Sequence, residues 1–289
     1  MSKTLYTYQL HEESESQYTV TMLPDHFFAR DHVVGGRPLL PGSVYLDLML
    51  QVLRKKHPHV TGLRNMVWLA PIVITQPTSL VLDCSTKDIC QIKIDQKLYA
   101  RVRANYLLPE RGEDFDAEKL KSCLPEQTAG DHIYLISKQA KFSYGPTFKI
   151  LQHSWWNSNE ALVTWELATE LLPYLDQMLL HPVVVDGSFQ AAGVSRHREE
   201  SHGRSYVPCA LKELTLIRKL PSKGLFHLRY QREASSADQH SFDIDIYDDS
   251  QLAAAIRGYT VRDLCGNANP CLPSAKIKLA NITGESMHK

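Results

Sequence analysis

Two side chains in this sequence lie next to segments that could hold them in apolar surroundings: His32 and Asp186. His32 is followed by a Gly-rich stretch containing Gly36 and by Pro41, which comes just before an apolar segment. A neutral imidazole held in an apolar cleft can act as a general base. The chain has 13 histidines, however, and a histidine near a turn is more often a surface or core residue. His32 is therefore a candidate base whose role depends on its partners.

Asp186 follows three consecutive valines, which place its carboxyl group beside an apolar wall. Desolvation at such a wall raises the pKa of a carboxyl group and keeps it protonated near neutral pH, as a proton donor requires. Gln190 comes four residues later, on the same face of a helix, where its amide could orient the carboxyl group. The simpler interpretation is that Asp186 only caps the N-terminus of a helix that begins there.

The elements that must position these groups are mostly strands. Alternation of apolar and polar residues predicts half-buried strands, because successive side chains in a strand point to opposite faces. Two segments lack this alternation and predict buried helices: Ser43 to Lys56, which is apolar nearly all round, and the segment from Asp186 towards Val194. The predicted strands cover residues 66–74, 80–84, 97–107, 161–167, 226–230, 242–246 and 251–262.

A charged segment with Pro and Gly, residues 109–131, separates two such groups of strands and reads as a connector with a short helical turn over 117–122. We therefore expect an α+β fold of the double hot-dog type, with two antiparallel sheets that each wrap around a central helix. The expected N-terminal hot dog spans residues 1–115 and carries His32. After a linker over residues 116–131, the C-terminal hot dog spans residues 132–280 and carries Asp186.

Composition excludes several functions. The 289 residues carry 32 basic and 32 acidic side chains, a balance that disfavours a nucleic-acid binder. No apolar run is long enough to span a membrane and the first residues do not form a signal peptide, so we expect a cytoplasmic protein. The six cysteines are scattered without a paired zinc-finger spacing, so we expect neither a metal site nor a disulfide framework.

A third ordered segment completes the pattern. Tyr144-Gly-Pro-Thr-Phe148 lies between the other two, and His-Pro precedes the segment from Asp186 to Gln190. With His32, Gly36 and Pro41 as HxxxGxxxxP, followed by YGPxF and DxxxQ, the chain resembles the dehydratase domain of modular polyketide synthases. A fourth family element, LPFxW, corresponds to residues 206–210, where only Pro208 clearly survives.

The resemblance implies a β-hydroxyacyl thioester substrate, carried on the phosphopantetheine arm of an acyl carrier protein, and no cofactor of the enzyme's own. His32 would be the base at the α-carbon and Asp186 the acid for the departing hydroxyl group. Substrate-binding roles would fall to Gly36, Pro41, Tyr144, Phe148 and Gln190. Backbone N–H groups of the Gly36 turn or of the Ser43 helix would stabilise the enolate.

The implied partners are the acyl carrier protein and other polyketide synthase domains, and a homodimer stays open. An acidic carrier protein would dock on basic residues at the mouth of the tunnel, for which we expect Arg37, Arg196, Arg198 and Arg204.

Four alternatives remain at this point. Some members of the family shift double bonds instead of removing water, and these are expected to lack the acid that Asp186 provides here. Others form pyran rings. Fungal product-template domains share the fold, but are not expected to carry both YGPxF and DxxxQ. The chain could also be an inactive module that only docks a carrier protein, which the presence of both His32 and Asp186 disfavours.

Overall fold

The computed structural model describes residues 7–107, 115–200, 205–236 and 238–263, with side chains described as far as residue 193 in the segment that ends at residue 200. The first half contains β1 (His11–Ser14), β2 (Gln17–Met22), α1 (Phe27–Arg30), β3 (His32–Val34), β4 (Arg37–Pro38), α2 (Gly42–Lys56), β5 (Gly62–Trp68), β6 (Thr78–Asp83), β7 (Ile89–Ile94) and β8 (Lys97–Asn105). The second half contains α3 (Ala117–Ser122), β9 (Glu126–Ala129), α4 (Gly130–Gln139), β10 (Phe142–Tyr144), η1 (Pro146–Phe148), β11 (Leu151–Trp156), β12 (Glu160–Glu166), η2 (Thr169–Gln177), α5 (Pro182–Glu200), β13 (Tyr206–Leu216), β14 (Lys223–Tyr230), η3 (Arg232–Ala234), β15 (Gln239–Asp248) and β16 (Gln251–Asp263).

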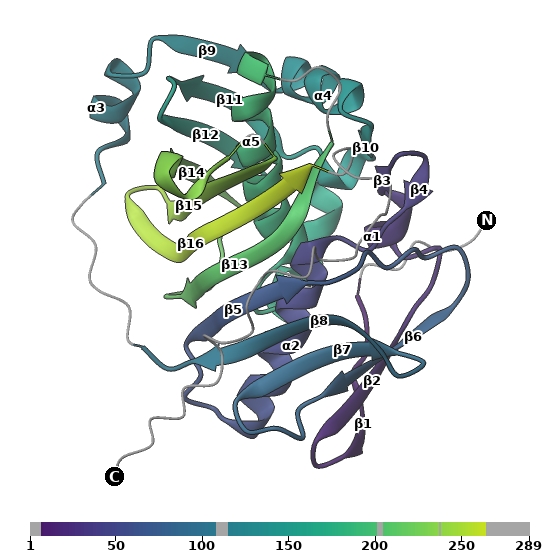
Figure 1. The fold of residues 1–289 in the computed structure, drawn as a ribbon. Coiled ribbons are helices and arrows are strands. Elements are labelled where there is room, and N and C mark those ends of the chain that lie inside the picture. The colour runs from purple at the N-terminus through teal and green to yellow at the C-terminus, as the bar shows by residue number, and fades with distance from the viewer. Residues whose placement is uncertain (1–6, 108–114, 201–204, 237, 264–289) are drawn as a thin grey trace.

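One long antiparallel sheet organises the molecule. Within the described residues it has 13 strands in the order β1-β2-β6-β7-β8-β5-β13-β16-β15-β14-β12-β11-β9. The helix α2 packs on β5, β7 and β8, and α5 packs on β11, β12, β14 and β15. Figure 1 shows the two halves side by side, each with its helix against its own strands. The expected double hot dog is confirmed, and its two sheets join edge to edge through β5 and β13.

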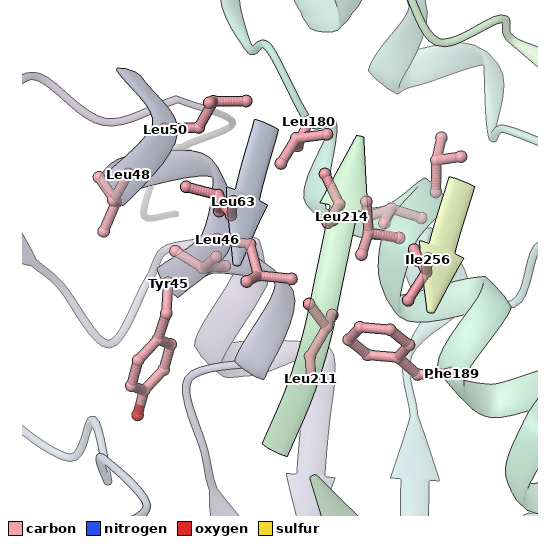
Figure 2. Packing of buried hydrophobic residues seen from close by; sticks show 14 of the residues in the cluster. Tyr45, Leu46, Leu48, Leu50, Leu63, Leu180, Phe189, Leu211, Leu214 and Ile256 are labelled. Atoms are coloured by element: carbon pink, nitrogen blue, oxygen red, sulfur yellow. The ribbon is translucent and has the colours of Figure 1, made fainter. Parts of the chain in front are cut away.

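The core is continuous across that joint. Every residue of α2 from Ser43 to Leu50 is buried, which is why its sequence shows no polar face. Figure 2 shows Leu46 of α2 and Leu63 of β5 on one side of the joint, with Leu214 of β13 and Leu180 on the other. These side chains form one hydrophobic cluster, so the two halves fold against each other as a unit.

Two expectations need correction. The second central helix begins at Pro182 and not at Asp186, so Asp186 lies inside α5 and is not its cap. The linker expected over residues 116–131 is shorter: α3 forms over the predicted helical turn, but β9 pairs with β11 and α4 begins at Gly130. A four-residue strand and a helix start among Gly and charged residues carry too little periodicity to be separated from a connector.

A tight hairpin in a separate three-stranded sheet, β10-β3-β4, holds the segment that carries His32. Val34 of β3 pairs with Arg37 of β4, so the loop between them is only Gly35 and Gly36. Both residues have positive φ angles, 57° and 77°. A two-residue turn of this kind requires φ above zero at both positions, which glycine adopts at little cost. This geometry explains the pair of glycines after His32.

A buried carboxylate lies where the halves meet. Asp47 of α2 is fully buried and accepts hydrogen bonds from the Leu180 backbone N–H and from Gln51, both at 2.7 Å, and also from the Tyr8 hydroxyl group. Burial raises the pKa of Asp47 to about 7, although the hydrogen bonds from Leu180 and Gln51 oppose the shift. Asp47 therefore joins the first half to the segment that leads into α5.

Asp47 should make the protein less stable as pH rises between about 4 and about 7. Its folded-state pKa lies above the ordinary value of 3.8, so the folded state binds more protons in this window and loses that advantage as Asp47 ionises. Each unit of pKa difference is worth about 1.4 kcal/mol of unfolding free energy. Asp47→Asn cannot ionise, so its stability relative to the parent should increase through the window. Urea unfolding at several pH values measures this difference; a constant difference would contradict the assignment.

Candidate active site

The backbone of one nearby residue fixes His32 on β3. The Leu39 N–H donates to the His32 carbonyl group at 3.1 Å, and His32 Nδ1 lies 2.9 Å from the Leu39 carbonyl oxygen. A carbonyl oxygen can only accept, so Nδ1 must carry the proton and Nε2 must be the free ring nitrogen. Nε2 lies 3.8 Å from Oδ1 of Asp186. The imidazole is thus held with its basic nitrogen toward the carboxyl group.

Asp186 occupies the second turn of α5, where all residues from Pro182 to Ala192 are buried. Its side chain is only 7 % exposed. Burial raises the pKa of Asp186, while His32 and the hydrogen bond from Gln190 oppose part of that rise. Gln190 Nε2 donates to Asp186 Oδ2 at 2.8 Å, so Oδ2 is the accepting oxygen. Oδ1, the oxygen that faces His32, is therefore the oxygen that is free to carry a proton when the carboxyl group is protonated.

The segment from Tyr144 to Phe148 adjoins this pair from the second half. Tyr144 of β10 pairs directly with His32 of β3, and its ring centre lies 5.7 Å from that of His32. The ring of Phe148 lies 5.6 Å from the same imidazole. The Phe148 carbonyl oxygen also accepts a hydrogen bond from Gln190 Nε2 at 3.2 Å. Two rings and one carbonyl group thus surround the pair.

A cavity of about 150 Å³ opens onto the two candidates. His32, Asp186, Tyr144 and Gln190 all line it, in walls contributed by both halves. The remainder of the lining is largely apolar, including Val34, Leu40, Trp68, Phe142, Phe189 and Val261. A histidine and an acid in a largely apolar cavity are suited to moving protons to and from a small organic substrate.

The other predicted site residues lie outside this lining. Gly36 is in the hairpin turn, Pro41 precedes α2, and Phe148 is fully buried behind the imidazole, so none of them is among the described residues that line the cavity. Gly42, the first residue of α2, does line it. The backbone N–H groups at a helix N-terminus lack partners within the helix and favour negative charge. The N-terminus of α2 is therefore better placed than the Gly36 turn to stabilise the negative charge of an enolate in the cavity.

Of the four basic residues predicted for docking, the described side chains include only that of Arg37. Arg37 is exposed on β4, at the edge of the hairpin that follows His32. The side chains of Arg196 and Arg198, and the whole of Arg204, lie outside the described residues. The docking surface therefore stays a prediction.

Sequence reasoning missed three contributors to the cavity and its surroundings. Trp68 lines the cavity and its indole N–H donates to the Gly42 carbonyl oxygen at 3.2 Å. Tyr259 of β16 lines it too, and its ring stacks on Phe189 at 3.9 Å between centres. Leu39 lines it as well, and its carbonyl oxygen lies 2.9 Å from His32 Nδ1. Nothing in strand alternation marks a residue as facing a cavity rather than the core, so no local signal identified them.

Two family models match this chain. The model described as "Polyketide synthase dehydratase domain" matches residues 6–101, and the model described as "Polyketide synthase dehydratase N-terminal domain" matches residues 112–269. The second match alone covers more than half of the chain. The first match ends at residue 101 and the second begins at residue 112, so the first contains His32 and the second contains Asp186.

Curated relatives are much longer proteins. Polyketide synthase PksN of Bacillus subtilis is 23 % identical over 290 residues, covering 93 % of this chain but 5 % of PksN. Polyketide synthase ThaG of Burkholderia thailandensis is 23 % identical over 268 residues, covering 83 % of this chain and 5 % of ThaG. The chain thus spans about a twentieth of the length of these relatives.

Solved structures share the fold. A dehydratase domain of a trans-AT polyketide synthase from Brevibacillus brevis matches with a TM-score of 0.78 and 20 % identity, covering 88 % of this chain and 96 % of that one. The dehydratase domain from the CurF module of Curacin polyketide synthase matches with a TM-score of 0.74 and 16 % identity, covering 90 % and 98 %. Together with the matches of the family models, the double hot dog identifies this chain as a member of the polyketide synthase dehydratase family.

Proposed function

We propose that this chain removes water from a β-hydroxyacyl thioester to give an α,β-enoyl thioester. The observation that carries the proposal is the opposed pair in the apolar cavity, with Nε2 of His32 facing Oδ1 of Asp186 at 3.8 Å. Elimination of water requires one group that accepts a proton from carbon and a second group that donates a proton to the departing oxygen. The two side chains supply one group of each kind.

His32 begins the reaction as the base. Nε2 takes the α-proton, and the electron pair of that C–H bond moves toward the thioester carbonyl group. The imidazolium that forms keeps its Nδ1–H bond to the Leu39 carbonyl oxygen, which disperses the positive charge. The negative charge that develops on the thioester oxygen is stabilised by N–H groups at the start of α2, where Gly42 lines the cavity.

Asp186 completes the elimination as the acid. Oδ1 donates its proton to the β-hydroxyl group, the C–O bond breaks, and water leaves as the C=C bond forms. The enzyme is then left with protonated His32 and ionised Asp186. A proton passed from Nε2 to Oδ1 restores both groups, and their 3.8 Å separation is short enough for one water molecule to relay it.

The proposed reaction also implies partner proteins and a location in the cell. The substrate is carried on the phosphopantetheine arm of an acyl carrier protein, no further cofactor takes part, and the other domains of a polyketide synthase act before and after this one. Support comes from the relatives, which are polyketide synthases many times longer than this chain. We propose a cytoplasmic location, and no helix among the described residues is long and apolar enough to cross a membrane. A homodimer is left as an alternative to the monomer; one similar structure is described as a monomeric dehydratase domain.

The test is to incubate the protein with a short β-hydroxyacyl thioester on a carrier protein and to follow its mass. We expect loss of one water molecule, dependent on His32 and Asp186. A parallel incubation with the enoyl thioester in deuterated water reports double-bond migration. A protein that moves double bonds but never removes water would be an isomerase, and one that does neither with any thioester would contradict the proposal.

Gln190→Ala should lower the rate of dehydration by roughly 10-fold, less than any change to Asp186 itself, because it loosens the carboxyl group without removing it. The lost hydrogen bonds are those to Asp186 Oδ2 and to the Phe148 carbonyl oxygen. Steady-state kinetics beside Gln127→Ala measure the effect; Gln127 is exposed on the edge strand β9 and does not line the cavity. An unchanged rate would show that Asp186 needs no such support.

A further inference from the structure

A buried hydrogen-bonded cluster joins the residue before His32 to the second half of the chain. Asp31 is 4 % exposed, and its Oδ2 accepts a hydrogen bond from the Thr147 hydroxyl group at 2.7 Å. Arg30 binds the same carboxylate with two nitrogens, at 2.6 and 2.9 Å. The backbone N–H of Gly145 donates to the Asp31 carbonyl oxygen at 2.8 Å. These hydrogen bonds meet at Asp31, whose carboxylate also accepts one from the Thr147 backbone N–H and whose own N–H donates to the Phe27 carbonyl oxygen at 2.9 Å.

The two segments approach so closely that only glycine fits at position 145. A Cβ atom on Gly145 would lie 2.4 Å from Cγ of Asp31, well inside the sum of their van der Waals radii. The φ angle of Gly145 is −78°, an ordinary value, so backbone freedom does not explain this glycine. Its role is to let the Asp31 carboxylate reach Thr147, a residue that is itself only 1 % exposed.

The segment held in this way contacts both members of the proposed catalytic pair. At one end Tyr144 pairs with His32 across the small sheet. At the other end Phe148 places its ring 5.6 Å from the imidazole, and its carbonyl oxygen binds the Gln190 amide that holds Asp186. A shift of residues 145–148 would therefore move the surroundings of the base and the support of the acid together.

We propose that Asp31 and Thr147 are positioning residues that set the His32–Asp186 geometry, by fixing the segment between Tyr144 and Phe148. The roles of His32 and Asp186 in this inference rest on the proposed function. We call the contact between Asp31 and Thr147 the clamp. It joins the two halves of the chain where their proposed catalytic groups meet. Arg30 holds the outer side of the carboxylate, so that Oδ2 stays directed at Thr147.

Thr147→Val removes the hydroxyl group and keeps the shape of the side chain. We expect kcat for dehydration to fall by about 10- to 100-fold with KM within about threefold, because a displaced pair slows proton transfer more than binding. Thr147→Ser restores the hydroxyl group and should return kcat to within about threefold of the parent. Should Thr147→Val fail to fold, Thr147→Ala takes its place in the comparison.

Thr215→Val is the matched control. Thr215 is also buried, donates a hydrogen bond to Glu213 at 3.0 Å, and receives a second from Asn105 of the other half, but it does not line the cavity. It should lose stability without loss of kcat. Equal effects of the Thr147 and Thr215 variants on kcat, or a loss at Thr147 that serine does not rescue, would overturn the clamp.

Nuclear magnetic resonance of labelled histidine gives a readout that needs no substrate. In the parent we expect His32 as the Nδ1–H form, and in Thr147→Val we expect its ring signals to shift or broaden, with the Thr215→Val spectrum unchanged at His32. A His32 spectrum identical in all three proteins would overturn the clamp. A parent that dehydrates no thioester, but whose His32 signals respond to Thr147→Val, would instead contradict the proposed function and leave the clamp supported.

Discussion

Replacing His32 with alanine should abolish dehydration, and it should abolish deuterium exchange at the carbon atoms of the enoyl product as well. Both reactions begin when a base removes a proton from carbon, and the structure offers Nε2 of His32 for that step. Loss of a positioned base typically costs about 10²- to 10⁴-fold in rate. Mass spectrometry of the carrier-bound product measures both reactions in one experiment.

His153→Ala is the control for this variant. His153 lies on β11, bonds weakly to Gln127 at 3.4 Å, and is not part of the cavity lining. It should keep the parent rate. Exchange that continues at the parent rate in His32→Ala, in a protein with an unchanged melting temperature, would show that another group acts as the base.

Replacing Asp186 with asparagine should remove dehydration but spare part of the exchange at carbon. The asparagine carbonyl oxygen can accept the Gln190 hydrogen bond in place of Oδ2, so the shape of the site is kept. The amide cannot give a proton to the departing hydroxyl group, whereas exchange needs only the base and the oxyanion donors. We expect a loss of about 10²- to 10⁴-fold in dehydration and a much smaller loss in exchange.

The pH dependence of the dehydration rate is a second test of Asp186 as the acid. Burial raises the pKa of Asp186, so the parent keeps its acid proton to higher pH than an exposed aspartate. The rate of dehydration should fall as pH rises through that pKa, because the acid is then ionised. Asp47→Asn, a change of the same kind at a buried carboxylate that does not line the cavity, should retain the parent profile. An Asp186→Asn protein that dehydrates at the parent rate would show that the acid is elsewhere.

The candidate pair was predictable because short motifs carry it. His32 precedes two glycines that a tight hairpin requires, and Asp186 follows three buried valines, so each residue has a local physical reason to occupy an apolar site. The spacing from Asp186 to Gln190 also predicted their hydrogen bond, since residues four apart lie on one helical face. The same local reasoning misplaced the start of α5, because Asp186 has the residue type of a cap without its position.

The sequence by itself predicted both buried central helices and the strands β6, β8, β12, β14, β15 and β16, because alternation and all-round apolarity are properties of neighbouring residues. It left β2, β7, β11 and β13 unpredicted. Through their motifs it also indicated His32 and Asp186 as the candidates for proton transfer. Only the tertiary structure decided that β5 and β13 join the two sheets, that the cavity is lined by Trp68 and Tyr259, and that Asp31 meets Thr147. Asp31 and Thr147 are 116 residues apart, as no local pattern can show. Contacts of that kind arise from the packing of one half against the other, where the fit of surfaces selects the partner.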